Sequence, residues 1–462
     1  MRRSLILAVT AALAATGSAV YIASSASAAA ACAPAWNSSA VYVKDNSVSY
    51  QAKNYTAKWW TQGEVPTASG QWGVWADKGA CGGTTPPPTT PPPTTPPPTT
   101  PPPTTPPPTT PPPTTPPPVS GLPKHALIGY LHSSFANGSG YLRMADVPAD
   151  WDIINLAFGE PTSATSGDIR FTLCPAAECP GVESEADFIN AIRAKRTAGK
   201  KVLLSIGGAN GQVQLTTTAA RDKFVSSVSA IIDKYGLDGV DIDFEGHSLS
   251  LNTGDTDFKN PTTPVIVNLI AALKSLKARY GANFVLTMAP ETFFVQLGYQ
   301  YYGSGPWGGQ DPRAGSYLPV IYAMRNDLTV LHVQDYNSGS IMGLDNQYHS
   351  MGGADFHIAM TDMMLAGFPV AGNTANMFPA LREDQVAFGA PSSVSAGNGY
   401  VAPAGVQQAV TCLVKGSNCG GYAVRSGTNP NFRGLMTWSI NWDKFYNWEF
   451  RTNHEGFLNG LG

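Results

Sequence analysis

The chain has 462 residues, which is more than one ordinary domain needs, and its 29 Lys and Arg residues nearly balance 32 Asp and Glu residues. No basic excess indicates binding to nucleic acid, so we expect no such partner. Aromatic residues make up 10% of the chain, a high share that includes ten Trp residues. The composition therefore predicts several folded units without a polyanionic partner.

Residues 1–30 have the pattern of an export signal. Arg2 and Arg3 supply a positive start, an apolar stretch follows over 5–15, and the small residues of "ASA" at 26–28 suit cleavage. The apolar stretch is too short to span a bilayer, which disfavours a membrane anchor. We therefore expect a secreted, extracellular protein that has no membrane contact after cleavage.

The six Cys residues suit an oxidising destination. They fall into three close groups, and linkers separate the groups, so we expect pairing within each one. No group has zinc-ligand spacing alongside His, and we predict neither a metal site nor a cofactor. The expected disulfides are Cys32–Cys81, Cys174–Cys179 and Cys412–Cys419. The histidines that we interpret as polar lining or surface are His132, His247, His332 and His357.

A linker is predicted over 84–120, where the unit TTPPP repeats. Proline lacks an N–H group and has a fixed φ, so this stretch cannot join the interior of a helix or a sheet. It should form an extended polyproline II spacer of about 3.1 Å per residue. A ligand for proline-binding domains is the alternative that we consider weaker for a secreted chain.

The linker separates a small module, 31–83, from a large one, 121–462. Fifty or so residues enclose little core, so a Cys32–Cys81 cross-link makes physical sense in the small module. Short alternating runs predict antiparallel strands there, with turns at 45–46 and 53–54.

Trp59 and Trp60 are adjacent in one of these runs. Neighbouring residues of a strand point to opposite faces, so at least one of the two rings should be exposed unless the strand bends. An exposed indole is a flat apolar plate that suits the apolar face of a sugar ring. The alternative is that both rings belong to the core.

The small module also carries a longer signature, Y-x-A-x-W-W-T-x-G-x-x-P, at Tyr55 to Pro66. In this it resembles the chitin-binding modules of carbohydrate-binding families 5 and 12. The resemblance implies an all-β module in which Trp59 and Trp60 form part of the sugar-binding surface.

The large module alternates strand-like and helix-like runs. Apolar positions recur at helical spacing over 224–235 and 266–276, and Gly236 and Gly281 supply the stops. Such alternation predicts a parallel sheet, and eight strands predict a (β/α)8 TIM barrel, with a doubly wound open sheet as the alternative. The expected strands are 127–130, 153–158, 202–206, 239–244, 284–288, 330–336, 386–388 and 434–438.

The stretch "YGLDGVDIDFEGHS" at 235–248 alternates acids with hydrophobic residues. Side chains alternate along a strand, so Asp241, Asp243 and Glu245 share one face, which in a barrel points inward near the C-terminal mouth. Burying acids together raises the pKa of at least one of them, which allows a carboxylic acid to act as a general acid near neutral pH. The alternatives are a calcium loop, whose ligand pattern fits poorly, and a solvated acidic strand.

Four motifs in order then resemble those of glycoside hydrolase family 18, the bacterial chitinases. In chain order they are S-x-G-G at 205–208, D-G-x-D-x-D-x-E at 238–245, V-Q-D-Y-N at 333–337 and M-T-W-S at 436–439. The run "LTMAPE" at 286–291 also fits. The resemblance implies a chitinase that hydrolyses β-1,4 bonds between N-acetylglucosamine units, with chitin and its oligomers as partners. We expect the protein to act as a monomer.

The resemblance also implies roles for individual residues. Glu245 would be the acid/base, Asp243 would orient the substrate acetamide, and Tyr336 would hydrogen-bond its oxygen. Asp241 would share protons with Asp243, and Trp438 would form the floor under the sugar. The remaining residues implied to line this subsite are Tyr130, Phe158, Met288, Gln334 and Asn337.

Geometry favours one mechanism within this family. On one strand, the Cα atoms of Asp243 and Glu245 lie about 6.7 Å apart on the same side, so Asp243 is poorly placed as a nucleophile. The C2 acetamide of the substrate can attack instead, which gives retention. Glu291 is the rival nucleophile.

The mode of action and two other functions complete the expectations. The stretch between the seventh and eighth strands is too short for the small α+β insertion of family members with deep clefts, so we expect endo action. An endo-β-N-acetylglucosaminidase that acts on N-glycans is one alternative function. A non-hydrolytic chitin-binding protein is the other, although such proteins lack the acid that Glu245 supplies here.

Overall fold

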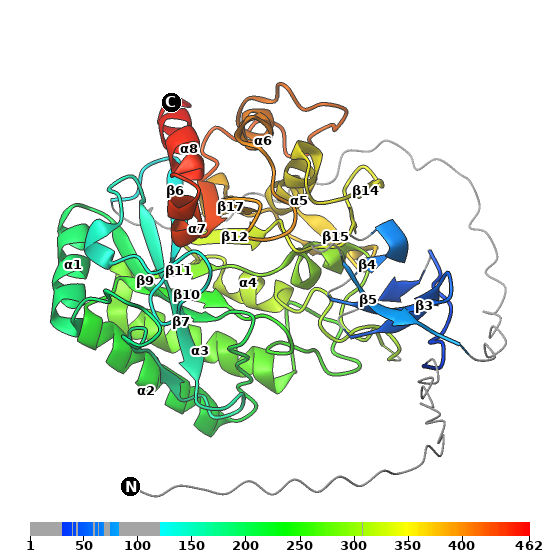
Figure 1. Ribbon diagram of the computed structural model, residues 1–462, viewed down its shortest axis with the longest axis horizontal. Helices are drawn as coiled ribbons and strands as arrows, with labels where there is room; N and C mark the ends of the chain where they lie inside the picture. The colour runs from blue at the N-terminus through cyan, green and yellow to red at the C-terminus, as the bar shows by residue number, and fades with distance from the viewer. Residues whose placement is uncertain are drawn as a thin grey trace, which may run out of the picture.

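The computed structural model describes residues 30–38, 40–42, 45–58, 61–62, 64–68, 74–82, 121–306 and 308–462 (Figure 1). The expected signal peptide up to residue 29, the linker over 84–120, and Trp59 and Trp60 lie outside these residues.

The small module is built from antiparallel strands. A three-stranded sheet has the order β2-β3-β5, and β1 pairs with β4 in a separate two-stranded sheet. The β2–β3 turn lies at Gln51 and Ala52, both with positive φ, which is two residues earlier than expected. The strands are β1 (Val41–Tyr42), β2 (Ser47–Tyr50), β3 (Lys53–Ala57), β4 (Thr61–Gln62) and β5 (Trp75–Ala80), with a 3-10 helix η1 (Pro66–Ala68).

The core of this module is small and aromatic. Tyr55 and Trp75 are buried, and the Trp75 indole donates a hydrogen bond to the Glu64 carbonyl oxygen (2.9 Å). The disulfide Cys32–Cys81 closes a loop of 49 residues around this core. A cross-link over such a loop stabilises a small unit chiefly by restricting its unfolded chain.

The large module is a closed barrel of eight parallel strands. Each strand pairs with the next, and the last pairs with the first through Leu435 and Leu127, so the sheet has no open edge. This closure confirms the predicted TIM barrel and excludes the doubly wound open sheet. The strands are, in order around the barrel, β6 (Ala126–His132), β7 (Ile153–Pro161), β9 (Lys201–Gly207), β10 (Gly239–Asp243), β11 (Val285–Met288), β12 (Val330–Gln334), β17 (Val386–Pro391) and β18 (Gly434–Trp438).

Helices cover the outside of the barrel, and Figure 1 shows α1, α2 and α3 lying along the strands. Local signals fix their ends: the Thr217 side chain accepts a hydrogen bond from the Ala220 N–H at the start of α2, and Gly236 ends α2 with φ 65°. The helices are α1 (Glu185–Thr197), α2 (Thr218–Tyr235), α3 (Pro264–Tyr280), α4 (Leu318–Met324), α5 (Ala354–Ala366), α6 (Pro403–Lys415), α7 (Ile440–Phe445) and α8 (Glu449–Asn459).

Shorter elements occupy the connections. Antiparallel β8 (Ile169–Arg170) extends β7, and two hairpins lie between β12 and β17. The hairpins are β13 (Ile341–Met342) with β14 (Tyr348–His349), and β15 (Phe368–Val370) with β16 (Asn373–Phe378). The 3-10 helices of this module are η2 (Met144–Asp146), η3 (Gly281–Asn283), η4 (Thr292–Phe294), η5 (Gln296–Tyr299) and η6 (Glu383–Gln385). Disulfides Cys174–Cys179 and Cys412–Cys419 complete the three expected pairs.

The alternation of side chains along the strands creates two separate hydrophobic clusters. One lies between strands and helices and includes Val240 and Ile242 of β10, while the other lies inside the barrel and includes Val285 and Tyr130. Residues of odd and even number on β10 therefore face different environments, which leaves Asp241 and Asp243 inside.

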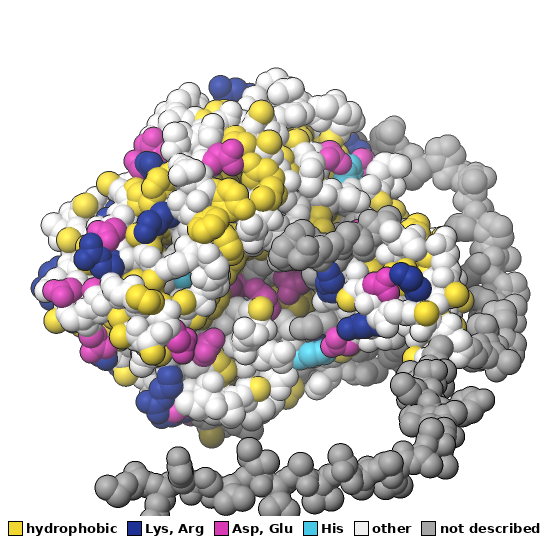
Figure 2. All heavy atoms as spheres, viewed as in Figure 1, with side chains coloured by type: hydrophobic (Ala, Val, Ile, Leu, Met, Phe, Trp, Pro, Cys, Tyr) yellow, Lys and Arg dark blue, Asp and Glu magenta, His cyan; other side chains and the backbone are white. Residues whose placement is uncertain are grey.

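The surface has no strong charge asymmetry on the side drawn in Figure 2, where basic and acidic side chains are interspersed. Within the described residues, no helix has the length and apolar character required to cross a membrane.

Candidate active site

Strand β10 delivers the first two acids of the motif, but it ends at Asp243. The next peptide N–H, that of Phe244, donates to the Tyr317 hydroxyl (2.7 Å) rather than to a neighbouring strand. Glu245 therefore lies just beyond the strand end, half-buried, and not on the strand as the simple alternation predicted. Glu245 nevertheless lies next to Asp243, since the side-chain amide of Gln334 contacts both carboxylates.

Asp241 is fully buried and is surrounded by hydroxyl groups from three other strands. Tyr130 (2.7 Å) and Ser205 (2.8 Å) donate to its Oδ2 atom, and Thr287 (2.6 Å) donates to Oδ1. These neutral hydroxyl groups satisfy the buried carboxyl group and so offset the cost of its burial.

Asp243 lies one step nearer the mouth of the barrel and is also buried. Burial is the largest cause that raises its pKa well above the ordinary value, and the charges of Glu245 and Asp241 raise it further. Asp243 therefore binds a proton under conditions in which an exposed aspartate is ionised.

The Gln334 side chain joins Asp243 to Glu245. Its Nε2 atom donates to Asp243 Oδ1 (2.8 Å) and to Glu245 Oε1 (3.0 Å), and it also lies 2.9 Å from the Ala289 carbonyl oxygen. The two carboxylates are thus held around one amide at the C-terminal end of the strands, which is where barrel enzymes carry their chemistry.

Tyr336 is buried two residues after Gln334. Burial raises the pKa of its phenol well above the ordinary value, and the nearby charges of Asp243 and Glu245 add to this effect. The hydroxyl group therefore retains its proton and serves as a hydrogen-bond donor next to the two acids.

The glycine pair of the S-x-G-G motif has a steric reason. A Cβ atom on Gly207 would lie 2.1 Å from the backbone oxygen of Asp243, and the residue has φ 118°. A Cβ atom on Gly208 would lie 2.7 Å from the Phe158 ring. Both positions allow β9 to approach the acid-bearing strand and the aromatic ring closely, which a larger residue would prevent.

Aromatic rings gather beside the acids. The Phe158 and Trp438 rings are nearly parallel, with centroids 5.5 Å apart and an interplanar angle of 9°, and Tyr130 lies 5.7 Å from Trp438. Phe135 is parallel to both of the first two rings, at 3° and 11°. Phe135 was missed from the sequence because it lies in a loop after β6, where no periodicity marks it.

Two residues predicted for this subsite do not join it directly. Met288 pairs with Ile242 in the β10–β11 register and is buried in the cluster between strands and helices. Because Thr287 points into the barrel, the next residue, Met288, points outward toward the helices. Asn337 uses its side-chain oxygen to accept a hydrogen bond from the Asn398 backbone N–H (2.8 Å), so it anchors a neighbouring loop.

Glu291 lies close to the acids, as its place in "LTMAPE" suggested. It forms a parallel bridge with Gln334, and its charge contributes to the raised pKa values of Asp243 and Tyr336. It therefore belongs to the electrostatic environment of the site.

Three of the four histidines interpreted as lining or surface, His132, His332 and His357, are fully buried. His332 lies inside the barrel next to Asp241. His357 on α5 pairs with Asp335 (3.2 Å), whose pKa burial raises to about 6. Inward parity on β12 was the signal available for His332, since it lies two residues before Gln334.

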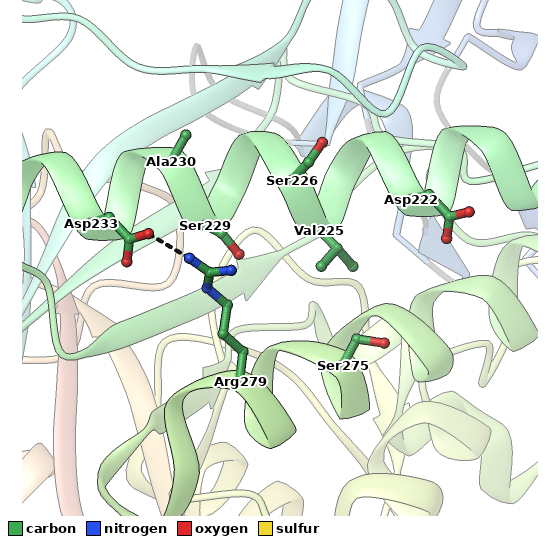
Figure 3. A pocket seen from close by; sticks show the side chains of 8 residues that line it. All are labelled: Asp222, Val225, Ser226, Ser229, Ala230, Asp233, Ser275 and Arg279. Carbon is green, nitrogen blue, oxygen red and sulfur yellow. Dashed lines mark hydrogen bonds and ion pairs between the residues drawn. The ribbon is translucent and has the colours of Figure 1, made fainter.

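The described residues contain no group of three or more side chains suited to hold a metal ion. A groove of about 420 Å³ lies on the outside, between α2 and α3 (Figure 3), where Arg279 forms an ion pair with Asp233 (2.7 Å). No residue of the acid cluster lines this groove, so we locate the site at the barrel mouth.

Known proteins agree with this geometry. Residues 126–307 match the family described as glycosyl hydrolases family 18, and residues 35–76 match carbohydrate-binding module family 5/12. The chain is 74% identical over 337 residues to "Exochitinase 1" of Streptomyces olivaceoviridis, covering 73% of this chain and 56% of that protein. It is 70% identical over 318 residues to "Probable class II chitinase" of Arthroderma benhamiae, covering 69% of this chain and 95% of that protein.

Solved structures give the same picture. A family GH18 chitinase from Chromobacterium violaceum is 37% identical, with a TM-score of 0.65, and the match covers 93% of this chain and all of that one. The chain spans little more than half of the Streptomyces relative but nearly all of the fungal one. The chain therefore belongs to family 18 of the glycosyl hydrolases.

Proposed function

We propose that the protein is a chitinase that hydrolyses the β-1,4 bonds between N-acetylglucosamine units. The observation that carries the proposal is the pair of carboxyl groups, Asp243 and Glu245, held around the Gln334 amide at the mouth of the barrel. The relatives described above are named as chitinases, which supports the choice of substrate.

Glu245 is the acid/base of the proposed reaction. It is half-buried, whereas Asp243 is buried, so Glu245 is the carboxyl group that a glycosidic oxygen can reach. A positioned acid of this kind protonates the leaving oxygen and later removes a proton from water.

The nucleophile is the C2 acetamide oxygen of the substrate itself. Retention requires attack from the face opposite the acid, but Asp243 lies on the same side as Glu245, hydrogen-bonded to the same nitrogen. Asp243 orients the acetamide, and the protonated Tyr336 hydroxyl donates to its oxygen, which keeps the attacking atom in place.

Trp438 supplies the floor under the sugar. Its ring, with Phe158 and Phe135 parallel to it, offers an apolar surface beside the acids. Sugar rings present apolar faces that pack on such surfaces. The other proposed lining residues are Tyr130 and Gln334.

We further propose that the protein is secreted and acts as a monomer on insoluble chitin, to which the module of residues 31–83 attaches it. The proposed boundaries are a signal peptide over 1–30, a linker over 84–120 and a catalytic barrel over 121–462. Membrane-spanning helices are absent from the described residues.

The proposed mode of action is endo. The segment between β17 and β18 contains the single helix α6 and no strand, so no additional folded wall rises beside the site there. An open site binds the middle of a chain. The Streptomyces relative is named an exochitinase, which makes exo action the competing outcome.

Glu245→Gln tests the acid. The amide has the shape of the acid but cannot donate a catalytic proton, so we expect kcat on soluble N-acetylglucosamine oligomers to fall by roughly 10²–10⁴. Glu178→Gln makes the same change at an exposed residue outside the acid motif. It serves as the control and should retain full activity. Near wild-type turnover by the Glu245 variant would show that Glu245 is not the catalytic acid.

Removal of the acetamide tests the nucleophile. Fully N-acetylated oligomers should be cleaved, whereas fully deacetylated oligomers of equal length should yield almost no product, because the attacking oxygen is missing. Product analysis by mass spectrometry measures both. Efficient cleavage of the deacetylated series would mean that a protein carboxylate, with Glu291 as the candidate, performs the attack.

Trp59→Ala/Trp60→Ala tests the module within the full chain. Attachment raises the effective concentration of the barrel at a solid surface, so activity on insoluble chitin should fall at least about tenfold while activity on soluble oligomers stays unchanged. A variant lacking residues 32–118 should show the same pattern. Equal losses on both substrates would argue against an attachment role.

A time course of products from colloidal chitin tests the mode. Endo action should release oligomers of several lengths early, together with a rapid fall in the viscosity of a soluble chitin derivative. Release of a single short product from the start, with little change in viscosity, would establish exo action instead.

A further inference from the structure

His332 occupies an unusual place for a histidine. It lies in the middle of β12, its side chain is completely buried, and it points into the barrel. Its Nε2 atom lies 3.4 Å from Oδ1 of Asp241. The Tyr130 ring, which belongs to another donor to Asp241, contacts the imidazole edge-on at 6.2 Å.

The imidazole carries an unused donor. Burial lowers the pKa of His332, so the ring is neutral at ordinary pH and has one N–H group. Within the described part of the chain, neither ring nitrogen has a hydrogen-bond partner. A buried N–H group without an acceptor is costly, and the carboxylate that faces it is Asp241.

The hydrogen bonds that Asp241 accepts leave its Oδ1 atom able to accept one more. Among the described residues, Oδ2 accepts two hydroxyl groups, from Tyr130 and Ser205, whereas Oδ1 accepts only that of Thr287. A carboxylate oxygen accepts about two hydrogen bonds. The remaining position is therefore on Oδ1, which is the atom that His332 approaches.

The other titratable groups around this pair are few. Asp243 follows Asp241 on the same strand, and Tyr130 faces both from β6; Tyr317 and Tyr336 also sense the charge of Asp241. On the adjacent strands, Ala387 pairs with His332 and Thr287 pairs with Val330, two residues before His332, and neither of these side chains titrates. Among the described residues, the donors to Asp241 are neutral hydroxyl groups.

We propose that His332 is a positioning residue for the catalytic carboxyl groups. Its Nε2–H donates to Oδ1 of Asp241 as a fourth donor, keeps Asp241 ionised, and so confines the exchangeable proton to Asp243 and Glu245. The inference rests on the proposed glycosidase function of these acids.

The direction of the effect on pH dependence follows from the charges. Without the fourth donor, Asp241 binds a proton more readily, so the acidic limb of the kcat/KM profile moves to higher pH. At the alkaline limb Asp241 is ionised with or without the fourth donor, so that limb stays in place. The active range becomes narrower from the acidic side only.

Two amide variants separate the donor from the bulk of the side chain. His332→Gln places an N–H group close to the position of Nε2, whereas His332→Asn places it near Nδ1, away from Asp241. His332→Phe retains a flat ring without a donor. His454→Phe removes another fully buried histidine, on α8, and serves as the control.

The measurement is the pH profile of kcat/KM on soluble N-acetylglucosamine oligomers with the full chain, together with its melting temperature. We expect His332→Asn and His332→Phe to move the acidic limb up by about one pH unit, which corresponds to one neutral hydrogen bond, and to leave the alkaline limb in place. His332→Gln and His454→Phe should retain the wild-type limbs. If His332→Phe does not fold, the pH profiles of His332→Gln and His332→Asn alone test the role of the donor.

Carboxyl ¹³C NMR of Asp-labelled protein gives a readout that does not need activity. The Asp241 signal should titrate at higher pH in the Asn variant than in the Gln variant. Identical limbs and identical titrations in these two variants would overturn the role of His332. Loss of the proposed function is distinguishable, since the wild-type chain would then cleave no oligomer while the NMR difference remained.

Discussion

The structure of the site depends on the burial of Asp241 and Asp243, which are 0% and 3% exposed. Such burial is possible only when neutral groups supply hydrogen bonds. The donors come from β6, β9, β11 and β12, which surround β10 inside the barrel but are scattered along the chain. Closure of the sheet between β18 and β6 positions Tyr130 opposite the acids. An open sheet would leave β6 at an edge, so barrel closure and acid burial require each other.

The alternation of residues predicted much of this arrangement. It located all eight strands and directed Asp241 and Asp243 inward, because a buried strand allows only two side-chain directions. It did not identify partners: Thr287 and His332 have inward parity, yet parity says nothing about which strands meet at the same depth. Phe135 lies in a loop, where no period applies. Met288 shows the opposite failure, since the motif suggested the site while its register with Ile242 directs it outward.

The prediction also continued the alternation of β10 two residues too far, to Glu245. Strand β10 ends at Asp243, and the Tyr317 hydroxyl replaces the next ladder hydrogen bond, which a sequence pattern cannot reveal. The consequence is a gradient of exposure from Asp241 through Asp243 to Glu245. The innermost acid is surrounded by fixed hydroxyl donors, the middle one has a raised pKa, and the last can reach a substrate. The three carboxyl groups therefore differ in chemistry because they differ in depth.

The count of donors around Gln334 shows why these acids need a proton between them. Its Nε2 atom has two hydrogens but three acceptors within reach: Asp243, Glu245 and the Ala289 carbonyl oxygen. One further donor satisfies all three, and a single proton held on Asp243 and directed at Glu245 supplies it. The hydrogen bond between these two carboxyl groups, which contributes to the raised pKa of Asp243, has this form.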